Sequence, residues 1–286
     1  MNRDIDTRVS IKVVSANDFI TANELSALPL NSRKLLYLAI SQCKKTDKEF
    51  FEYTISVKDF ADMMGIDESN IYREGQVITG RLMGLSLNCN LNGLGYDQYS
   101  LFSKCSYRER EGTISFKLNP DMTSFFLNLK KDFSQPLLND FVRMNSPYSM
   151  AVWHLMQREM HSQKPSITQT IEFDLTVEEL RQVTGTENKL RQIGQFKERV
   201  LDKAIREIKD NCGVVVTYTN LKKSRTVVGF HFVAVQEYHI DESDIPEHVR
   251  RHAEEGKRRI AAEQQKRGIS EPIGQEQLDL FSFLDK

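Results

Sequence analysis

The stretch that decides the fold is QFKERVLDKAIREIK, which runs from Gln195 to Lys209. Its main apolar side chains recur every four residues, and two more widen the stripe: Phe196, Val200, Ala204 and Ile208, with Leu201 and Ile205. This spacing is typical of an amphipathic helix that lies on a core. The opposite side is polar and mostly basic, and it carries Gln195, Arg199, Asp202, Lys203 and Arg206.

The segments on both sides of this helix complete a recognisable order. Before it, Val177 to Thr184 has a helical pattern that ends at Gly185; after it, Val214–Tyr218 and Thr226–Val235 read as strands around a basic turn at 220–225. Helix, turn, basic helix and charged hairpin is the order of a winged helix, which places one helix in the DNA major groove. An amphipathic surface helix followed by a solvated hairpin has the same pattern, so both interpretations stay open.

The charge distribution favours a nucleic-acid partner. Between Lys189 and Arg225 there are ten Lys or Arg and four acidic residues, whereas the whole chain has 39 basic and 40 acidic residues. A cluster of basic residues in a protein of nearly zero net charge produces a local positive electrostatic potential. Acids on the same helix count against DNA contact, although a carboxylate can accept a hydrogen bond from cytosine.

Length and composition exclude several classes of protein. A chain of 286 residues is long enough for two domains, and 40% hydrophobic with 28% charged residues is ordinary for a soluble protein. No apolar run approaches the ~20 residues that span a bilayer. The N-terminus has no signal region, so we expect a cytoplasmic protein without membrane contact. The scattered cysteines, Cys43, Cys89, Cys105 and Cys212, predict neither a disulfide framework nor a zinc site.

An internal repeat links the two halves of the chain. Ile55–Gly65 matches Leu175–Gly185 in character, position by position, at a constant offset of 120 residues. In both copies a Ser or Thr precedes an acid by three residues, which starts a helix, and a Gly stops it. Each copy is followed by a second helix, at 68–83 and at 195–209. Chance would have to produce these features twice, so duplication is the better explanation.

The sequence therefore predicts an α+β protein, mostly helical, with two tandem winged-helix domains related by duplication and a flexible C-terminal tail. We expect an arm at 1–20, a first domain at 21–134, a second at 135–240 and a tail at 241–286. The tail has few large apolar residues, so it cannot bury a core. Within the first domain, a helix at 32–42 should expose Arg33 and Lys34, and 125–133 should be helical.

Four segments resemble the iteron-binding, theta-type class of plasmid replication initiators. They are LPLNSRKLLYLAI (28–40), VKDFADMMGIDESNIYREG (57–75), NSPYSMAVWHLM (145–156) and FKERVLDKAIREI (196–208), and the resemblance covers roughly residues 20–238. It implies tandem winged helices that bind repeated origin sites, with monomers that help to open the origin and dimers that repress their own gene. By this analogy the second winged helix has the stronger DNA grip, and the first contributes DNA and dimer contacts. A transcriptional repressor without initiator activity is the alternative.

Candidate DNA-binding residues follow from these patterns. On the basic helix, Arg199 and Arg206 are placed to read base edges, because the Arg fork matches guanine, and Lys197 and Lys203 flank them. At the wing, Lys222, Lys223 and Arg225 are expected to contact phosphates. In the first half the candidates are the polar side chains of the helix 68–83, with a partner-binding surface as the alternative: Ser69, Asn70, Tyr72, Arg73 and Gln76.

The end of the chain carries a second recognisable motif. The run Gln277-Leu278-Asp279-Leu280-Phe281 resembles the pentapeptide by which bacterial proteins dock on the DNA polymerase sliding clamp. Its apolar side chains would anchor in a preformed groove, with Gln277 as the polar contact. The alternative is a tail that folds back on its own domain. Host replication proteins are therefore expected partners.

Enzyme motifs are lacking in the sequence. It has no GxxxxGK[ST] phosphate loop, and its six histidines form no His-x-His or HExxH pattern. We therefore expect a protein without catalytic activity, metal or cofactor. A nicking, rolling-circle initiator is the most distant of the three interpretations.

Overall fold

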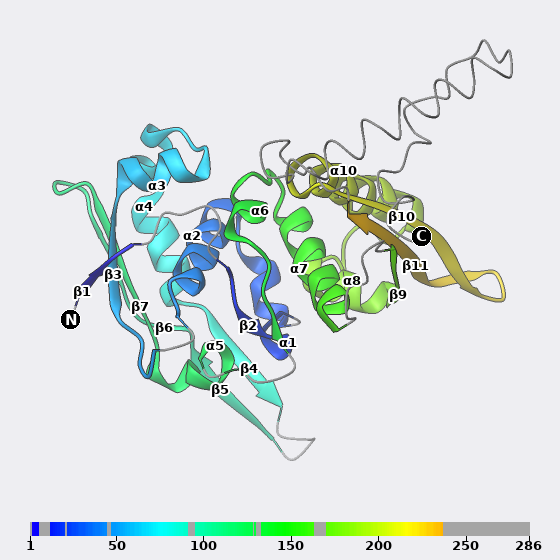
Figure 1. Ribbon diagram of the computed structural model, residues 1–286, viewed down its shortest axis with the longest axis horizontal. Helices are drawn as coiled ribbons and strands as arrows, with labels where there is room; N and C mark the ends of the chain where they lie inside the picture. Colours follow the sequence, from blue (N-terminus) through cyan, green and yellow to red (C-terminus); the bar gives the residue numbers. More distant parts are fainter. Residues whose placement is uncertain are drawn as a thin grey trace, which may run out of the picture. The chain divides into compact units, whose positions relative to one another are not determined.

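The computed structural model describes residues 2–5, 12–20, 22–44, 47–90, 95–127, 129, 133–162 and 170–236. All of them belong to one compact unit. Figure 1 shows two groups of helices, each accompanied by its own β-sheet. Among the described ranges, no helix is long and apolar enough to cross a membrane.

The first half holds a winged helix preceded by short elements. These are β1 (Asn2–Asp4), β2 (Ser15–Ala16), α1 (Asn17–Ile20) and the 3-10 turn η1 (Asn23–Ala27). The winged helix consists of α2 (Leu30–Ser41), β3 (Glu52–Ser56), α3 (Val57–Met64), α4 (Glu68–Met83), β6 (Phe102–Arg108) and β7 (Thr113–Leu118). A separate hairpin lies between α4 and β6 in the chain, formed by β4 (Ser86–Asn90) and β5 (Tyr96–Ser100). The larger sheet has the order β1-β3-β7-β6; its β1–β3 pair is parallel and the other pairs are antiparallel.

Short elements and one long helix lead to the second half. They are η2 (Pro120–Met122), α5 (Thr123–Phe126), β8 (Phe133–Ser134), α6 (Leu138–Val142) and α7 (Pro147–Ser162). The second winged helix follows as β9 (Thr170–Thr176), α8 (Val177–Thr184), α9 (Ile193–Phe196), the π-helical turn η3 (Lys197–Leu201), α10 (Asp202–Cys212), β10 (Val214–Lys223) and β11 (Thr226–Gln236). Its antiparallel sheet has the order β10-β11-β9.

The sheet of the second half packs through one face. Along β9 buried and exposed residues alternate, and Ile171, Phe173 and Leu175 are the buried ones. On the neighbouring strand β11, Phe230 and Phe232 are completely buried, and Phe173 stacks on Phe232 with ring centroids 5.6 Å apart. Alternation with a period of two is what a strand needs to bury one face and leave the other in water.

The predicted duplication is present in the backbone. Ser56 caps α3 by accepting from the Asp59 amide at 2.9 Å, and Thr176 caps α8 by accepting from the Glu179 amide at 3.1 Å. Both helices end at a left-handed glycine, with φ of 60° at Gly65 and 62° at Gly185. A side chain at this φ is strained, which is why Gly stops both helices.

The prediction that Arg33 and Lys34 lie on the solvent side of α2 is wrong. Both are 3% exposed. Arg33 donates to the Leu25 carbonyl, and Lys34 Nζ donates to the carbonyls of Met64 at 2.8 Å and Val142 at 2.6 Å. These last two carbonyls end the short helices α3 and α6, where the helix dipole favours a cation. Burial nevertheless lowers the pKa of Lys34 to about 8.

Two further predictions need correction. The segment 125–133 was expected to be helical, but α5 ends at Phe126 and Phe133 already pairs in β8. Residues 12–20 were expected to belong to an arm, but Val13 and Phe19 are completely buried in the core. Apolar residues such as Val14 and Ile20 stand beside them, but this short stretch has no sustained period that marks it as part of a core.

The long helix α7 is held partly by buried polar groups. His154 hydrogen-bonds the hydroxyls of Tyr37 at 3.0 Å and Ser15 at 3.2 Å, and Trp153 Nε1 donates to Asp140 Oδ2 at 3.2 Å. Burial lowers the pKa of His154 to about 3, so its ring is neutral at pH 7. Satisfied buried polar contacts of this kind fix one orientation of a helix, which apolar packing alone specifies less sharply.

Candidate nucleic-acid interface

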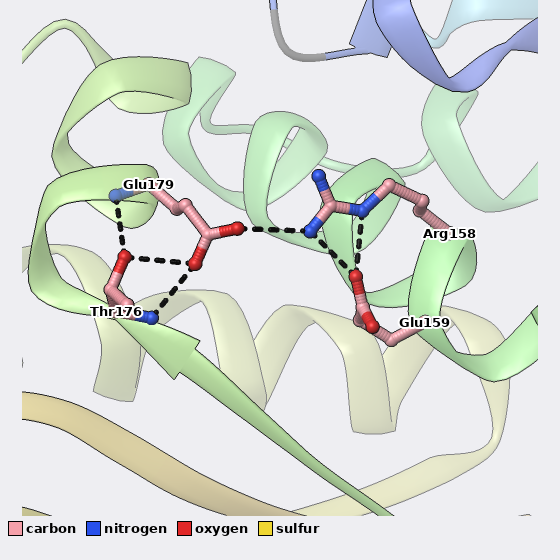
Figure 2. A network of polar contacts seen from close by, with 4 residues as sticks. All are labelled: Arg158, Glu159, Thr176 and Glu179. Carbon is pink, nitrogen blue, oxygen red and sulfur yellow. Dashed lines mark hydrogen bonds and ion pairs between the residues drawn. The ribbon is translucent and has the colours of Figure 1, made fainter.

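The first helix of the second winged helix, α8, is anchored at its N-terminus. Thr176 and Glu179 form a reciprocal capping box, in which the Thr176 amide donates to Glu179 Oε2 at 3.0 Å. Figure 2 shows that the guanidinium of Arg158 reaches Glu179 Oε1, at 3.2 Å, and also binds Glu159. Burial opposes ionisation of Glu179, but the bonds from Thr176 and Arg158 outweigh it and hold its pKa below the ordinary value. The cap is therefore tied to α7, which carries Arg158.

Arg181 shapes the turn that leads from α8 to the basic helix. Its guanidinium donates to four backbone carbonyls of the turn, those of Thr186, Lys189, Leu190 and Arg191, at 2.7 to 3.3 Å. It also lies 4.7 Å from the ring centroid of Phe196. Sequence reasoning missed this residue, because backbone carbonyls as acceptors leave no pattern in the sequence.

The basic helix is interrupted by a wide turn that explains its spacing. Side chains four residues apart drift by about 40° per step around an α-helix of 3.6 residues per turn. Here Phe196, Val200, Ala204 and Ile208 are all completely buried, although they are spaced by four throughout. The π-helical turn η3 lies within this run, and its longer i→i+5 repeat takes up the drift.

The predicted DNA-reading residues lie on the exposed side of this helix. Arg199, Lys203 and Arg206 are exposed, at spacings of four and three. Arg206 Nε makes a long bond of 3.3 Å to the Asp202 carbonyl, one turn earlier. Lys197 is partly buried, and its Nζ lies 5.2 Å from the ring centroid of Tyr218 on β10. The helix therefore presents cations to the outside and apolar groups to the core, as predicted.

Two of the acids on this helix are held by protein donors. Asp202 Oδ1 accepts from the Tyr218 hydroxyl at 2.7 Å. Glu207 Oε2 accepts from the Asn145 amide at 3.0 Å, just before the start of α7. The objection that acids weaken a DNA-facing helix is smaller when their carboxylates already have partners within the protein.

The wing differs from prediction in its length. The turn was expected at 220–225, but β10 runs on to Lys223 and the turn proper is Ser224-Arg225, with a φ of 57° at Ser224. A two-residue connection with positive φ matches the twist of the paired strands. Lys222, Lys223 and Arg225 are nevertheless all exposed, so the tip is as basic and accessible as the sequence predicted.

In the first half, α4 occupies the position that the basic helix has in the second. Of its candidate residues, Ser69, Tyr72, Arg73 and Gln76 are exposed and Asn70 is half-buried.

Some of the polar groups on α4 are used within the protein. Ser69 Oγ donates to the capping residue Asp67, while Arg73 donates to Asn70 Oδ1 at 2.7 Å and pairs with Glu74 at 3.5 Å. The helix carries two basic and two acidic residues, so its charge is balanced: Glu68, Arg73, Glu74 and Arg81. Its role therefore stays open between DNA contact and partner contact.

Gly75 in α4 has a packing role that the sequence did not reveal. A Cβ there would lie 2.6 Å from Cε2 of Tyr107, whose ring covers this point of the helix. The Tyr107 hydroxyl donates to the Tyr72 carbonyl at 3.0 Å. The absence of a side chain at Gly75 thus allows α4 to pack closely against Tyr107 on strand β6.

Two further points concern the clamp motif and metal ions. The clamp motif, Gln277, Leu278, Asp279, Leu280 and Phe281, lies outside the described residues, as does the tail from 241 onward. Among the residues that the structure describes, no cluster of three or more His, Cys, Asp or Glu could hold a metal ion.

Two winged helices in tandem, the second with an exposed row of cations on its helix and a basic wing, define a class of nucleic-acid-binding protein. Comparison with known families then gives the particular family. The family described as "Initiator Replication protein, WH1" matches residues 12–157, and "Initiator Rep protein, WH2" matches residues 176–233. Together these matches cover most of the chain, so the protein belongs to the replication initiator family. The domain limits of these matches differ from the predicted division at residue 134.

Comparison with individual proteins agrees with this family assignment. The chain is 27% identical over 214 residues to the "PI protein" of Escherichia coli, covering 65% of this chain and 70% of that protein. The solved structure "Crystal structure of Pi initiator protein in complex with iteron DNA" matches with a TM-score of 0.67 and 22% identity, covering 80% of this chain and 99% of the other. At this identity the structural match establishes the fold, and it confirms the prediction of tandem winged helices.

Proposed function

We propose that this replication initiator binds double-stranded DNA at repeated origin sites, or iterons, of a plasmid. The observation that carries the proposal is the exposed cationic row Arg199, Lys203 and Arg206 on the second helix of a winged helix. The similar Pi initiator protein was solved in complex with iteron DNA, which supports the same ligand for this chain. Helices in this position of a winged helix enter the major groove.

Each basic group has an expected task in this proposal. Arg199 and Arg206 read base edges, because each can donate two bonds to guanine. Lys197 and Lys203 contact the DNA backbone beside these base contacts. Lys222, Lys223 and Arg225 hold phosphates next to the groove and add affinity without sequence information.

The first half has a mixed role in the proposal. Its α4 residues, Ser69, Asn70, Tyr72, Arg73 and Gln76, contribute a weaker DNA contact. The same domain contributes the contact between two copies when the protein represses its own gene. The balanced charge of α4 supports a smaller share of affinity here than in the second half.

Footprinting on the DNA that flanks the gene tests the proposal. Several protected repeats spaced by about two helical turns, beside an AT-rich segment, would support the initiator. One protected palindrome would support the repressor alternative instead. Protein without specific protection on this DNA would refute both.

We also propose that the initiator works without catalysing a reaction, in the cytoplasm, and recruits host replication proteins. Single-stranded breaks after incubation with a supercoiled origin plasmid and magnesium would contradict the first part and support a nicking enzyme. The clamp contact at 277–281 is tested by deletion. The shortened protein should keep its footprint and lose capture by purified sliding clamp, whereas retained capture would refute the docking.

A further inference from the structure

The helical run 193–212 is nearly balanced in charge, although the region around it is basic. It contains five basic and four acidic residues: Lys197, Arg199, Lys203, Arg206 and Lys209, with Glu198, Asp202, Glu207 and Asp210. An acid that points toward DNA repels phosphates as strongly as a cation at the same distance attracts them. The usefulness of this helix to DNA binding therefore depends on where its carboxylates are held.

Asp202 lies beside two of the cations that are expected to contact DNA. It is one residue before Lys203, and its backbone carbonyl accepts from Arg206 Nε at 3.3 Å. Asp202 itself is exposed, so its carboxylate has no burial to restrain it. The bond of 2.7 Å from the hydroxyl of Tyr218 is what holds Oδ1 toward the sheet.

The Tyr218 ring is fixed independently of that bond. It meets Phe230 edge-on at a centroid distance of 5.3 Å and Phe232 at 5.7 Å, and both phenylalanines are completely buried. On the outside, Lys197 Nζ lies 5.2 Å from the ring centroid. The hydroxyl therefore has a preset position, and a phenylalanine in place of Tyr218 would keep the ring contacts and lose only the bond to Asp202.

We propose that Tyr218 is a positioning residue for DNA binding, whose hydroxyl holds the Asp202 carboxylate away from the phosphates. This inference rests on the proposed binding of DNA by the helix 193–212. Without the bond, the exposed carboxylate is free to turn beside Lys203 and Arg206, where it opposes their attraction for DNA. Tyr218 thus keeps the carboxylate from weakening the attraction of these cations for DNA, and it does so without touching DNA itself.

The effect is measured with the footprinted duplex by titration at several salt concentrations. Tyr218→Phe should weaken binding about three- to tenfold, which corresponds to one unit charge several ångströms from a phosphate at an interface. The salt dependence should also become shallower, by up to about 0.9 in the slope of log K against log salt, because one acid cancels part of one cation. A role confined to folding would lower thermal stability and leave this slope unchanged.

A double-mutant cycle with Asp202→Asn separates this role from other roles of the hydroxyl. In the Asp202→Asn background there is no charge to hold, so Tyr218→Phe should then change affinity by less than about twofold. Tyr99→Phe is the matched control, because its hydroxyl donates to Asp97 at 3.2 Å on the hairpin of the first half. The control should bind DNA as the wild type does.

Each result of these binding experiments either supports or contradicts the positioning role of Tyr218. Wild-type affinity for Tyr218→Phe, or an equal loss in both backgrounds, would overturn the positioning role while leaving DNA binding intact. If the wild-type protein itself binds no flanking DNA, the proposed function fails and this inference fails with it. Asp202→Asn alone keeps the phenol bond to its side-chain oxygen, so it should bind at least as tightly as the wild type; weaker binding would also contradict the proposal.

Discussion

The two glycines in the interior of α4 should respond in opposite directions to the same substitution. At Gly75 an added Cβ would lie 2.6 Å from Tyr107, whereas at Gly80 nothing lies within 4 Å. Alanine is better than glycine in a helix interior by about 1 kcal/mol. Gly80→Ala should therefore raise the free energy of unfolding by about 0.5–1 kcal/mol.

Gly75→Ala gains the same stabilisation from helix propensity, but its added Cβ displaces the Tyr107 ring. Forcing extra volume into a packed contact costs about 1–3 kcal/mol, and losing the bond of Tyr107 to the Tyr72 carbonyl costs about 1 kcal/mol more. The net expectation is a destabilisation of about 1–3 kcal/mol. The free energies of unfolding of the two variants should thus differ by about 1.5–4 kcal/mol, although the two glycines are only five residues apart.

Urea unfolding measures the difference, with fluorescence of the single tryptophan, the buried Trp153, as a probe. Tyr107→Ala provides the second background: once the ring is gone, Gly75→Ala should stabilise as Gly80→Ala does. If Gly75→Ala stabilises the otherwise wild-type protein, the Tyr107 ring does not rest on the helix. The packing that fixes α4 against β6 would then be refuted.

Three further predictions concern the site and the residues that support it. Arg206→Ala should cost about 1–3 kcal/mol of specific binding if Arg206 reads a base. Arg225→Ala should instead weaken binding to all DNA sequences alike and lower the slope of log K against log salt by about 1. Equal footprints and affinities for Arg206→Ala and wild type would show that Arg206 does not read a base. Arg181→Met removes the donors to four turn carbonyls, so it should lower the free energy of unfolding by about 2 kcal/mol and weaken DNA binding, and Arg181→Lys should restore only part of both. Burial raises the pKa of Asp140 to about 6, despite the bond from Trp153, so the contribution of Asp140 to wild-type stability should fall by roughly 2 kcal/mol as pH rises from about 4 to about 6. Asp140→Asn does not titrate there, so its stability relative to wild type should rise over the same range in urea titrations; a difference independent of pH would contradict the buried carboxyl.

The elements that could be predicted from the sequence are those with local signals. Caps and left-handed glycines lie within one turn of the helix they delimit, so α8 was predicted at Val177–Thr184, as found. The bounds of α4, Glu68–Met83, were also predicted correctly. The cationic side of the basic helix followed from its apolar stripe. Both results rest on interactions between residues that are close in sequence.

What the sequence did not reveal depends on partners far along the chain. Lys34 is buried because its ammonium reaches the carbonyls of Met64 and Val142, which lie 30 and 108 residues away. Tyr218 and Asp202 meet across 16 residues, from a strand and a helix. Side-chain bonds of this kind have no period and no motif, so only coordinates could supply them.

The comparison of the halves separates what duplication preserved from what it changed. The cap, the first helix and the left-handed glycine recur at Ser56–Gly65 and Thr176–Gly185 with nearly equal backbone angles. The second helices share the position but not the surface. On α4 the charges cancel and one glycine makes room for an aromatic ring, whereas on the helix 193–212 the acids Asp202 and Glu207 are held by protein donors and the cations face outward. A backbone scaffold depends on local geometry, which both copies satisfy; an electrostatic surface can change at single exposed positions without cost to that scaffold. Unequal DNA affinity of the two halves is therefore the expected result of duplication followed by change at the surface.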